Sequence, residues 1–490
     1  MTELEVKLRV SDAALPSLRE ALRAHGARSM RMQARYFDTE DGRLAKAGVA
    51  LRMRREGRRW MQTLKAAGAG AVHRLEHEVP VKLAASALPA VDARRHDGSE
   101  AAPALQAALH GTSATALVER HATDAQRLSC RLVDPLGCHI EVALDTGHAI
   151  ALGRTAPLAE VELEHKGGPV RGVFDLAASW IEHGGLWLCT ITKAQRGERL
   201  LRGQAVPPAT KARAPKLVPG IDGAALMRAC LQSALEQVLA NVSDIAEGVT
   251  AAETIHQARV GLRRLRSVLR DLAALSPAIA PDWDGVLAAA FAHLGELRDD
   301  EVVAQAVRPL LQAAAAPRLS WQPRGRADPV ATVRDKTFQR ALLAILALAH
   351  ADDASFAPLS SPAARAWLAQ RLGLLHEQVA RDGRRFERLP LERQHRVRKR
   401  LKRLRYLVEL TTDLWPQSSV RTYLKRLAAA QDALGHHNDV AVAAAAFRAD
   451  AAQHPAAWFA AGYLAAHLAV TARAARKQLV KVARAERCWT

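Results

Sequence analysis

The first residues of the chain alternate between charged and aliphatic side chains. Glu3, Glu5 and Lys7 occupy odd positions, and the even positions of segment 3–10 are aliphatic. Successive side chains of a β-strand point to opposite faces, so these charges share one face. Carboxylates bind hard divalent cations, and basic side chains bind phosphate oxygens. The pattern therefore indicates a face that could hold a metal ion and an anion together.

The same alternation recurs in later segments, where carboxylates gather on some strands and basic residues on others. The residues that share a face are Arg52 and Arg54, then Arg74, Glu76 and Glu78, then Glu141 and Asp145, then Glu160, Glu162 and Glu164. A solvated sheet face is the simpler interpretation for any single strand. For the whole set we favour a closed barrel with its charged faces inward, around one cavity. Because buried unpaired charge is costly, we expect divalent cations and a polyphosphate to neutralise it.

Six segments of residues 1–203 resemble, in the same order, the motifs of the CYTH, or triphosphate tunnel metalloenzyme, family. They are ELEVK at 3–7 (ExExK), RYFDT at 35–39 (YFDT), LRMR at 51–54 (LRxR), QTLK at 62–65, EVELE at 160–164 (the late ELE strand) and TKAQRG at 192–197. The last resembles the closing Lys-rich segment, with Ala194 where the family often has Ser. The resemblance implies an α+β fold with an N-terminal eight-stranded antiparallel tunnel and flanking helices. It also implies that the tunnel binds triphosphates with Mg²⁺ or Mn²⁺.

The resemblance implies roles for single residues as well. The implied metal ligands are Glu3, Glu5, Glu160 and Glu162. The implied phosphate contacts are Lys7, Arg52, Arg54, Lys65, Lys193 and Arg196, with Arg127 as a further anion contact. Glu3, Glu5, Lys7 and Lys65 are the implied catalytic residues. Glu76, Glu78 and Asp145 are either further metal ligands or residues that orient the basic side chains.

A duplicated basic helix marks the second part of the chain. Segment 256–266 aligns with segment 395–405 at an offset of 139 residues, with His, Arg, two basic residues, Leu and Arg in register. On a helical wheel the basic residues of each copy share one face, opposite a leucine face. A solvated helix face is the simpler interpretation of one copy. Because like charges at this spacing destabilise an isolated helix, two such copies favour a bound polyanion.

Residues 221–490 resemble the CHAD domain, a helical family with repeated histidine and basic motifs that is associated with inorganic polyphosphate. The resemblance implies an all-α domain of two duplicated helical bundles. The implied polyphosphate contacts are His256, Arg259, Arg263, Arg266, Arg270, His395, Arg398, Lys402 and Arg405, followed by Arg264, Lys399, Arg403, Lys425 and Arg426. The two histidines either bind phosphate or are satisfied structural side chains, and both interpretations stay open.

Composition divides the chain in the same place. Segment 204–220 contains four prolines and three basic residues but no acid, which predicts a linker between domains 1–203 and 221–490. The formal net charge of the 490 residues is +20, which favours polyanionic partners. Only 4% of the residues are aromatic, which is few for stacking on nucleic acid bases. We therefore expect inorganic triphosphate and polyphosphate as partners, and no specific nucleic acid.

The sequence also bears on the location of the protein. The amino terminus does not resemble a signal peptide, and the longest aliphatic run, residues 341–349, is too short to span a membrane. The five cysteines are scattered and form no CxxC pair, which argues against a zinc site. We expect a cytoplasmic protein without a membrane partner, with polyphosphate granules as a candidate location.

The expected function is metal-dependent hydrolysis of inorganic triphosphate to pyrophosphate and phosphate, next to a module that binds polyphosphate. Three alternatives stay open: a non-catalytic, granule-associated polyphosphate-binding protein, a thiamine triphosphatase, and an adenylate cyclase of the class IV type. The last two need a pocket for an organic group, which the sequence does not reveal. The sequence also leaves the oligomeric state, the metal used and the preferred phosphate chain length open.

Overall fold

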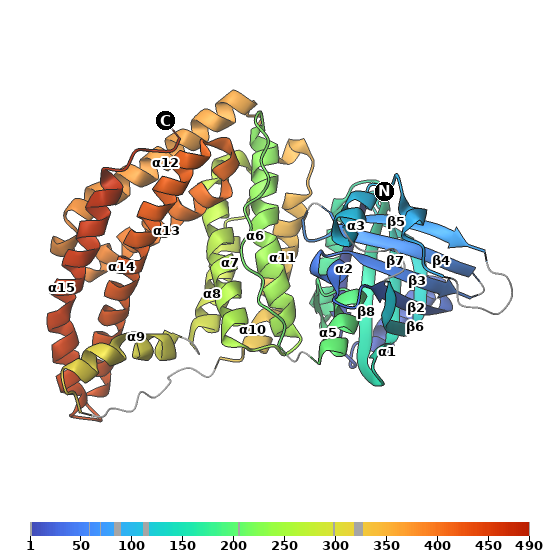
Figure 1. The fold of residues 1–490 in the computed structure, drawn as a ribbon, viewed down its shortest axis with the longest axis horizontal. Coiled ribbons are helices and arrows are strands. Elements are labelled where there is room, and N and C mark those ends of the chain that lie inside the picture. Colours follow the sequence, from blue (N-terminus) through green and yellow to red (C-terminus); the bar gives the residue numbers. More distant parts are fainter. Residues whose placement is uncertain are drawn as a thin grey trace. The chain divides into compact units, whose positions relative to one another are not determined.

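The structure, a computed structural model, describes residues 2–57, 59–68, 70–82, 90–110, 117–203, 206–296, 299–317 and 327–489. Strands lie only in the blue to teal part of the chain, and the green to red part is helical (Figure 1). The chain forms two compact units. The first contains Met1–Lys211, Leu235–Ala258 and Val333–Ala351, and the second contains Ala212–Ala234, Arg259–Thr332 and Asp352–Thr490. Each unit is therefore assembled from segments that are distant in the sequence.

Eight antiparallel strands of the first unit close into a barrel. They are β1 (Thr2–Val10), β2 (Arg28–Asp38), β3 (Ala50–Glu56), β4 (Arg59–Ala67), β5 (His73–Val81), β6 (Val118–Val133), β7 (His139–Ala151) and β8 (Arg154–Gly167). The order around the barrel is β1-β5-β4-β3-β2-β6-β7-β8, and β8 pairs with β1 again. The short strand β9 (Leu186–Leu188) pairs with the end of β1. The predicted eight-stranded antiparallel barrel is confirmed.

Short helices flank the barrel and cover the apolar face of its strands. They are α1 (Leu15–Ala24), α2 (Arg43–Lys46), α3 (Ala102–Leu109), α4 (Arg171–His183) and α5 (Lys193–Arg202). Leu51 of β3 and Leu64 of β4 are fully buried and pack with Leu44 of α2 and Leu105 of α3. Since side chains alternate along a strand, the charged residues next to Leu51 and Leu64 point the other way, into the barrel.

The strand register sets charges of opposite sign side by side. Arg127 of β6 lies opposite Asp145 of β7, which lies opposite Glu160 of β8, and Glu160 lies opposite Arg9 of β1. Residues that face each other on adjacent strands have Cβ atoms only about 5 Å apart. The row therefore places two neighbouring carboxylates between two arginines across four strands, without any loop contribution.

Helices make up the rest of the described chain. They are α6 (Gly223–Ala246), α7 (Ala252–Asp271), α8 (Trp283–Glu296), α9 (Asp299–Ala313), α10 (Pro329–Arg334), α11 (Lys336–Ala349), α12 (Ser361–Arg384), α13 (Leu391–Leu410), α14 (Gln417–Asp450) and α15 (Ala457–Ala483). The sequence repeat appears in their lengths: α6 and α12 have 24 residues each, and α7 and α13 have 20. A three-residue 3₁₀ helix follows both α7 and α13. The predicted all-helical region with a duplication is confirmed.

The two copies of the repeat differ in their surroundings. Helices α12 to α15 belong wholly to the second unit, where they pack on one another. In the first copy, residues 235–258 of α6 and α7 pack in the first unit together with the barrel, and so does α11. The limits of the two compact units reflect this packing. The predicted domain limits at residues 203 and 221 stay a prediction.

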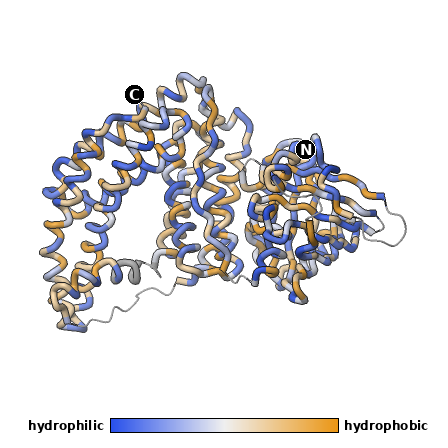
Figure 2. The backbone as a smooth tube through the Cα atoms, in the orientation of Figure 1, coloured by the Kyte–Doolittle hydropathy of each residue, from blue (hydrophilic) through white to orange (hydrophobic). Residues whose placement is uncertain are grey.

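Apolar and polar residues alternate along both the strands and the helices (Figure 2). No helix among the described residues is long and apolar enough to cross a membrane. The alternation of apolar and polar residues is typical of elements that bury one face and leave the other to solvent or to polar partners.

The predicted linker forms no helix or strand over residues 206–220, and residues 204 and 205 lie outside the described part. It is nevertheless held by hydrogen bonds. In the first unit, the Thr210 N–H donates to Asn241 Oδ1 at 3.0 Å. In the second, the Leu217 N–H donates to Asp413 Oδ2 at 3.1 Å, and the Leu217 side chain is buried. The segment is therefore irregular but held by hydrogen bonds at Thr210 and Leu217, and its role as a linker stays a prediction.

Helix α5 lies against the barrel strands, and Gly197 permits the close approach. A Cβ atom on Gly197 would lie 1.9 Å from the His121 ring of β6. We therefore expect Gly197→Ala to destabilise the protein by about 1–3 kcal/mol through overpacking. Thermal unfolding of the full chain measures the effect. Gly462→Ala is the matched control, because its Cβ meets nothing within 4 Å on α15; a drop of equal size in both variants would contradict this explanation.

Candidate functional site

The charged side chains singled out on the strands meet inside the barrel. The side chains of Glu3, Arg52, Lys65 and Glu162 are only 12 to 26% exposed. Lys65 of β4 lies 3.3 Å from Glu3 of β1, although β5 separates the two strands. Arg127 of β6 likewise reaches Glu162 of β8 across β7, at 2.8 Å. Contacts that skip a strand require side chains directed toward the barrel axis, so the charged faces point inward.

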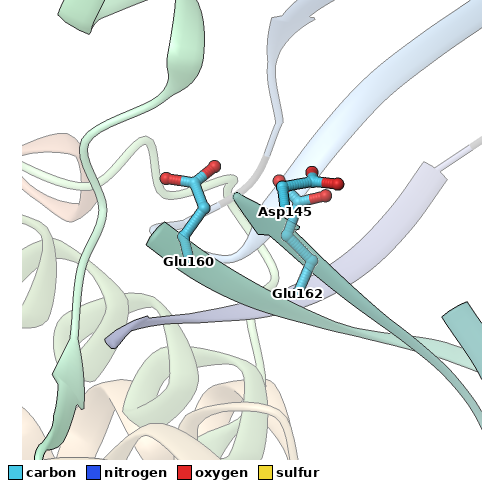
Figure 3. Close-up of side chains that lie close together, drawn as sticks. All are labelled: Asp145, Glu160 and Glu162. Carbon is cyan, nitrogen blue, oxygen red and sulfur yellow. The ribbon is translucent and has the colours of Figure 1, made fainter. Parts of the chain in front are cut away.

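Three carboxylates converge on one point of this interior. Asp145 of β7 and Glu160 and Glu162 of β8 each offer an oxygen, and these oxygens lie within 4.8 Å of one another. Figure 3 shows the three carboxylates turned to the same side of their strands. The Lys193 ammonium lies 2.8 Å from Asp145 and 2.6 Å from both glutamates. We call Asp145, Glu160 and Glu162 the carboxylate cluster.

The carboxylate cluster fits a divalent cation. Glu160 is fully buried, and neither of its oxygens has a hydrogen-bond partner among the described residues, although the Lys193 ammonium is close. A buried carboxylate normally needs hydrogen bonds or a cation to offset its lost hydration. Ca²⁺, Mg²⁺ and similar hard ions take such oxygen ligands without the directional demand of a hydrogen bond. The lysine ammonium already satisfies the demand for positive charge at this point.

The predicted metal ligand Glu5 lies near the carboxylate cluster. Lys7 is 3.7 Å from Glu160, 3.7 Å from Glu162 and 4.0 Å from Glu5. Burial raises the pKa of Glu5, and the nearby Glu162 charge raises it further. Glu5 therefore belongs to the same electrostatic group, with Lys7 between it and the carboxylate cluster.

Glu3 forms a second group with residues of β4 and β5. Lys65 lies 3.3 Å from Glu3 and 2.7 Å from Glu76, and Arg52 lies 4.0 Å from Glu76. Burial and a hydrogen bond with Glu76 raise the pKa of Glu3 to about 10. Burial also acts to raise the pKa of Glu76, but the Glu3 hydrogen bond and the charges of Lys65 and Arg52 outweigh it and lower that pKa. The two carboxyl groups therefore share one proton when no metal is bound.

Glu78 pairs with basic and polar neighbours. Arg54 Nη2 donates to Glu78 Oε1 at 2.8 Å, and Thr63 Oγ1 donates to the same oxygen at 3.0 Å. Of the three residues whose role the sequence left open, Asp145 joins the carboxylate cluster, while Glu76 and Glu78 lie against basic side chains. Their position fits the prediction that they orient those cations, and the choice between this role and metal binding stays a prediction.

One expectation from the sequence needs correction. We expected the charged interior to depend on bound ions for neutralisation, but carboxylates and cations inside the barrel pair with one another. Lys193 pairs with the carboxylate cluster, Arg127 with Asp145, and Lys65 with Glu76. The strand register creates the Arg127–Asp145 and Lys65–Glu76 pairs, and the packing of α5 brings Lys193 to the carboxylates; a strand pattern without a register could not have shown them.

The site also contains residues that sequence reasoning missed. Arg196 of α5 lies 3.9 Å from Glu160 and forms an ion pair at 2.9 Å with Glu247, which follows α6. Arg9, on the charged face of β1, lies 3.4 Å from the same Glu247. The alternation of β1 could have identified Arg9. Glu247 carries no motif, and only the packing of α6 in the first unit brings it here.

The second unit gathers four of the predicted basic residues on two helices. We call Arg259 and Arg263 of α7 and Arg398 and Lys402 of α13 the cationic cluster. Burial, together with the charges of Arg263, Arg398 and Arg259, lowers the pKa of Lys402 to about 6 against the opposing charge of Asp439. Such coupling requires proximity, so the basic faces of the two repeats meet, as the sequence predicted.

Other predicted basic residues of this unit have acidic partners. Asp284 of α8 accepts hydrogen bonds from Arg266 at 2.9 Å and from Arg270 at 2.8 Å. Arg405 pairs with Glu409, four residues further along α13, at 2.7 Å. These arginines are less available to an anion than the cationic cluster is.

The histidines of the repeats differ in burial. His395 Nδ1 hydrogen-bonds Asn438 Oδ1 at 3.1 Å and stays exposed, while His256 is half-buried on α7. His437 of α14 is buried. It is 4% exposed, and its ring nitrogens bond Thr471 and Gln394. A cavity of about 540 Å³ lies beside His395, between α13 and α14, and Arg398, Lys399 and Asn438 contribute to its lining.

Comparison with known families matches the strand-containing part and the helical part of the chain to two different families. Residues 1–197 match the CYTH domain, and residues 229–448 match the CHAD domain. The CHAD domain of the plant Ricinus communis is 29% identical, covers 57% of this chain and 98% of its own, and has a TM-score of 0.47. A putative adenylyl cyclase from Hippeastrum, described as having a dominant triphosphatase activity, is 18% identical, covers 42% and 98%, and has a TM-score of 0.30. A Pyrococcus horikoshii protein is 18% identical, covers 41% and 99%, and has a TM-score of 0.27.

The raised pKa of Glu3 predicts a pH-dependent stability of the metal-free protein. Between pH 4.5 and about 10 the folded state holds a proton on Glu3 that the unfolded chain has released. Because the folded state then binds more protons, the free energy of unfolding falls as the pH rises, by at most about 1.4 kcal/mol per unit from this group. We expect Glu3→Gln to remove this contribution in urea unfolding with chelator at pH 6 to 9. Glu20→Gln, exposed on α1, should keep the slope; the same slope in both variants would contradict the shared proton.

Proposed function

Since this chain contains a CYTH domain followed by a CHAD domain, we propose that it hydrolyses inorganic triphosphate to pyrophosphate and phosphate with a divalent cation. CYTH-domain proteins are triphosphatases or cyclases, so the reaction class follows from the family. The observation that carries the proposal is the carboxylate cluster, surrounded by basic side chains inside a closed barrel. Phosphoryl transfer depends mainly on alignment and on neutralisation of charge, and this interior offers both.

The carboxylates and cations that pair inside the barrel can exchange their partners when a divalent cation and a triphosphate bind. The carboxylate cluster with Glu3 and Glu5 would hold Mg²⁺ or Mn²⁺, which lowers the pKa of a bound water and neutralises phosphate charge. Lys193 then loses its carboxylate partners and is available to phosphate oxygens. Arg52, Arg54, Lys65 and Arg127 can exchange a carboxylate for a phosphate oxygen in the same way, and arginine binds such oxygens in bidentate fashion. Cation and anion therefore favour each other's binding.

The character of the inward positions supports an inorganic substrate over ATP or thiamine triphosphate. Inward positions of β1, β3, β5 and β8 carry charge at Glu3, Glu5, Lys7, Arg52, Arg54, Glu76, Glu78, Glu160 and Glu162. The aromatic rings of Tyr36 and His121 are buried and stack on each other, with centroids 4.6 Å apart. These charged positions suit a bare phosphate chain, which needs only charge, whereas a base or a thiazole ring would also need an apolar wall.

We further propose that the cationic cluster binds inorganic polyphosphate. Burial and the like charges of the neighbouring arginines lower the pKa of Lys402 to about 6. A polyanion would relieve that repulsion and restore the proton on Lys402. The Arg259 and Arg263 guanidinium groups lie 4.6 and 5.4 Å from the Phe291 ring centre, which holds them in place for such a ligand.

The triphosphatase proposal predicts that Glu160→Gln abolishes turnover. Removal of the charge of a buried metal ligand should lower the rate of phosphate release by about 100-fold or more. The measurement is phosphate release from tripolyphosphate, long-chain polyphosphate, thiamine triphosphate and ATP, each with Mg²⁺, Mn²⁺ or chelator. Asp175→Asn, an exposed carboxylate on α4, is the control. Turnover of tripolyphosphate in chelator would exclude the metal mechanism, and a preference for ATP or thiamine triphosphate would overturn the inorganic substrate.

The polyphosphate proposal predicts that charge reversal in the cationic cluster weakens binding selectively. Arg263→Glu combined with Lys402→Glu should lower polyphosphate affinity by about 100-fold, since each charged contact contributes roughly 1.5–3 kcal/mol. Arg448→Glu combined with Arg473→Glu, at exposed positions of α14 and α15, is the control for net charge. Binding is measured by calorimetry at fixed salt, with duplex DNA of equal charge as competitor. Equal losses in both variants, or a preference for DNA, would refute a polyphosphate site.

A further inference from the structure

Helix α5 carries two of the cations that face the carboxylate cluster. It begins at Lys193, and Thr192 caps it in a reciprocal pair of hydrogen bonds with Gln195. Lys193 points into the carboxylate cluster, and Arg196, one turn further, lies 3.9 Å from Glu160. The position of α5 therefore decides where both cations sit, and whatever fixes α5 also fixes this side of the site.

Two carboxylates at the end of α6 also pair with arginines of α5. Glu247 Oε2 accepts a hydrogen bond from Arg196 Nη1 at 2.9 Å, and Asp244 lies 2.7 Å from Arg199 Nη1. The two arginines are three residues apart in the sequence, and so are the two carboxylates. Three residues are about one turn of helix, so both arginines can meet a carboxylate at the same time. The Asp244 side chain is 4% exposed, and that of Glu247 is 17% exposed. Pairs shielded to this degree are screened less by salt than surface pairs are.

Neutral hydrogen bonds hold the segment that leads into α5. The Thr190 N–H donates to Ser243 Oγ of α6 at 2.9 Å, and the Leu188 N–H donates to Gln339 Oε1 of α11 at 2.8 Å. The Arg334 guanidinium lies 3.8 Å from the Trp187 ring centre. The chain from β9 to α5 is thus held on its outer side by residues that belong to the CHAD-matched part of the sequence but to the same compact unit as the barrel.

We propose that Glu247 is a positioning residue for the triphosphate site, so that the helical part of the chain completes the site of the barrel. The proposal rests on the triphosphatase function above. The Arg196 guanidinium has two carboxylates in reach, Glu247 at 2.9 Å and Glu160 at 3.9 Å. Glu247 holds it at the greater distance from Glu160. Without that charge Arg196 turns to Glu160, where it competes with the divalent cation and no longer meets the substrate.

The test is Glu247→Gln in the full chain. The amide keeps the size and one acceptor oxygen but loses the charge, so we expect about tenfold weaker Mn²⁺ binding without substrate and about tenfold higher KM for tripolyphosphate. The Tm and polyphosphate affinity should stay unchanged. Glu182→Gln is the matched control, because Glu182 of α4 also pairs with an arginine of α11, Arg340, at 2.7 Å but does not touch α5. Equal kinetics and Mn²⁺ affinity in both variants would overturn the proposal.

A double-mutant cycle separates positioning from a structural role. If Glu247 acts through Arg196, then Glu247→Gln should change KM and Mn²⁺ affinity little further in an Arg196→Gln background. Additive losses, or losses that follow a fall in Tm, would show that Glu247 only stabilises the fold and would overturn the proposal. Failure of the triphosphatase function itself is distinguishable, since the parent chain would then release no phosphate from tripolyphosphate.

Discussion

The pairing of opposite charges inside a closed barrel is the constraint on which the rest of this structure depends. A small barrel normally fills its interior with apolar side chains, whereas this one turns its apolar strand faces outward to the helices. The interior is stable only because the register sets carboxylates beside cations, as with Arg127, Asp145 and Glu160 across neighbouring strands. The same pairs make the site responsive, because a divalent cation and a phosphate chain can replace the two partners of each pair without changing the total charge.

The pairing of charges inside the barrel also depends on a helix outside the strands. The carboxylate cluster comes from β7 and β8, but its central cation, Lys193, comes from α5. Helix α5 rests on the strands through Gly197 and is held from outside by Asp244 and Glu247. The site therefore has an inner shell of strand residues and an outer support from helices that follow the linker. The two matched families are joined in one compact unit at this point.

The basic faces of α7 and α13 are similar in some positions of the repeat and differ in others. Equal helix lengths preserve the geometry that brings α7 and α13 together, and Arg259, Arg263 and Arg398 lie close enough to Lys402 to lower its pKa. Toward the carboxyl ends of α7 and α13 the two copies of the repeat differ in sequence. Arg270 pairs with Asp284, while the equivalent residue of the second copy is Glu409, which pairs with Arg405. A charge run in a sequence therefore contains both cations available to a ligand and cations already paired.

Local patterns in the sequence determined the strands, their charged faces, the barrel, the repeat and the inward residues, because alternation and helical spacing are properties of neighbouring residues. Asp145 beside Glu160 and Glu162, the pairing of Glu76 and Glu78 with cations, and the burial of His437 depend on register and on helix packing, and only the tertiary structure decided them. Glu247 shows the limit most clearly. Nothing near it in the chain marks it, and its role arises because folding brings the end of α6 to Arg196, 51 residues away.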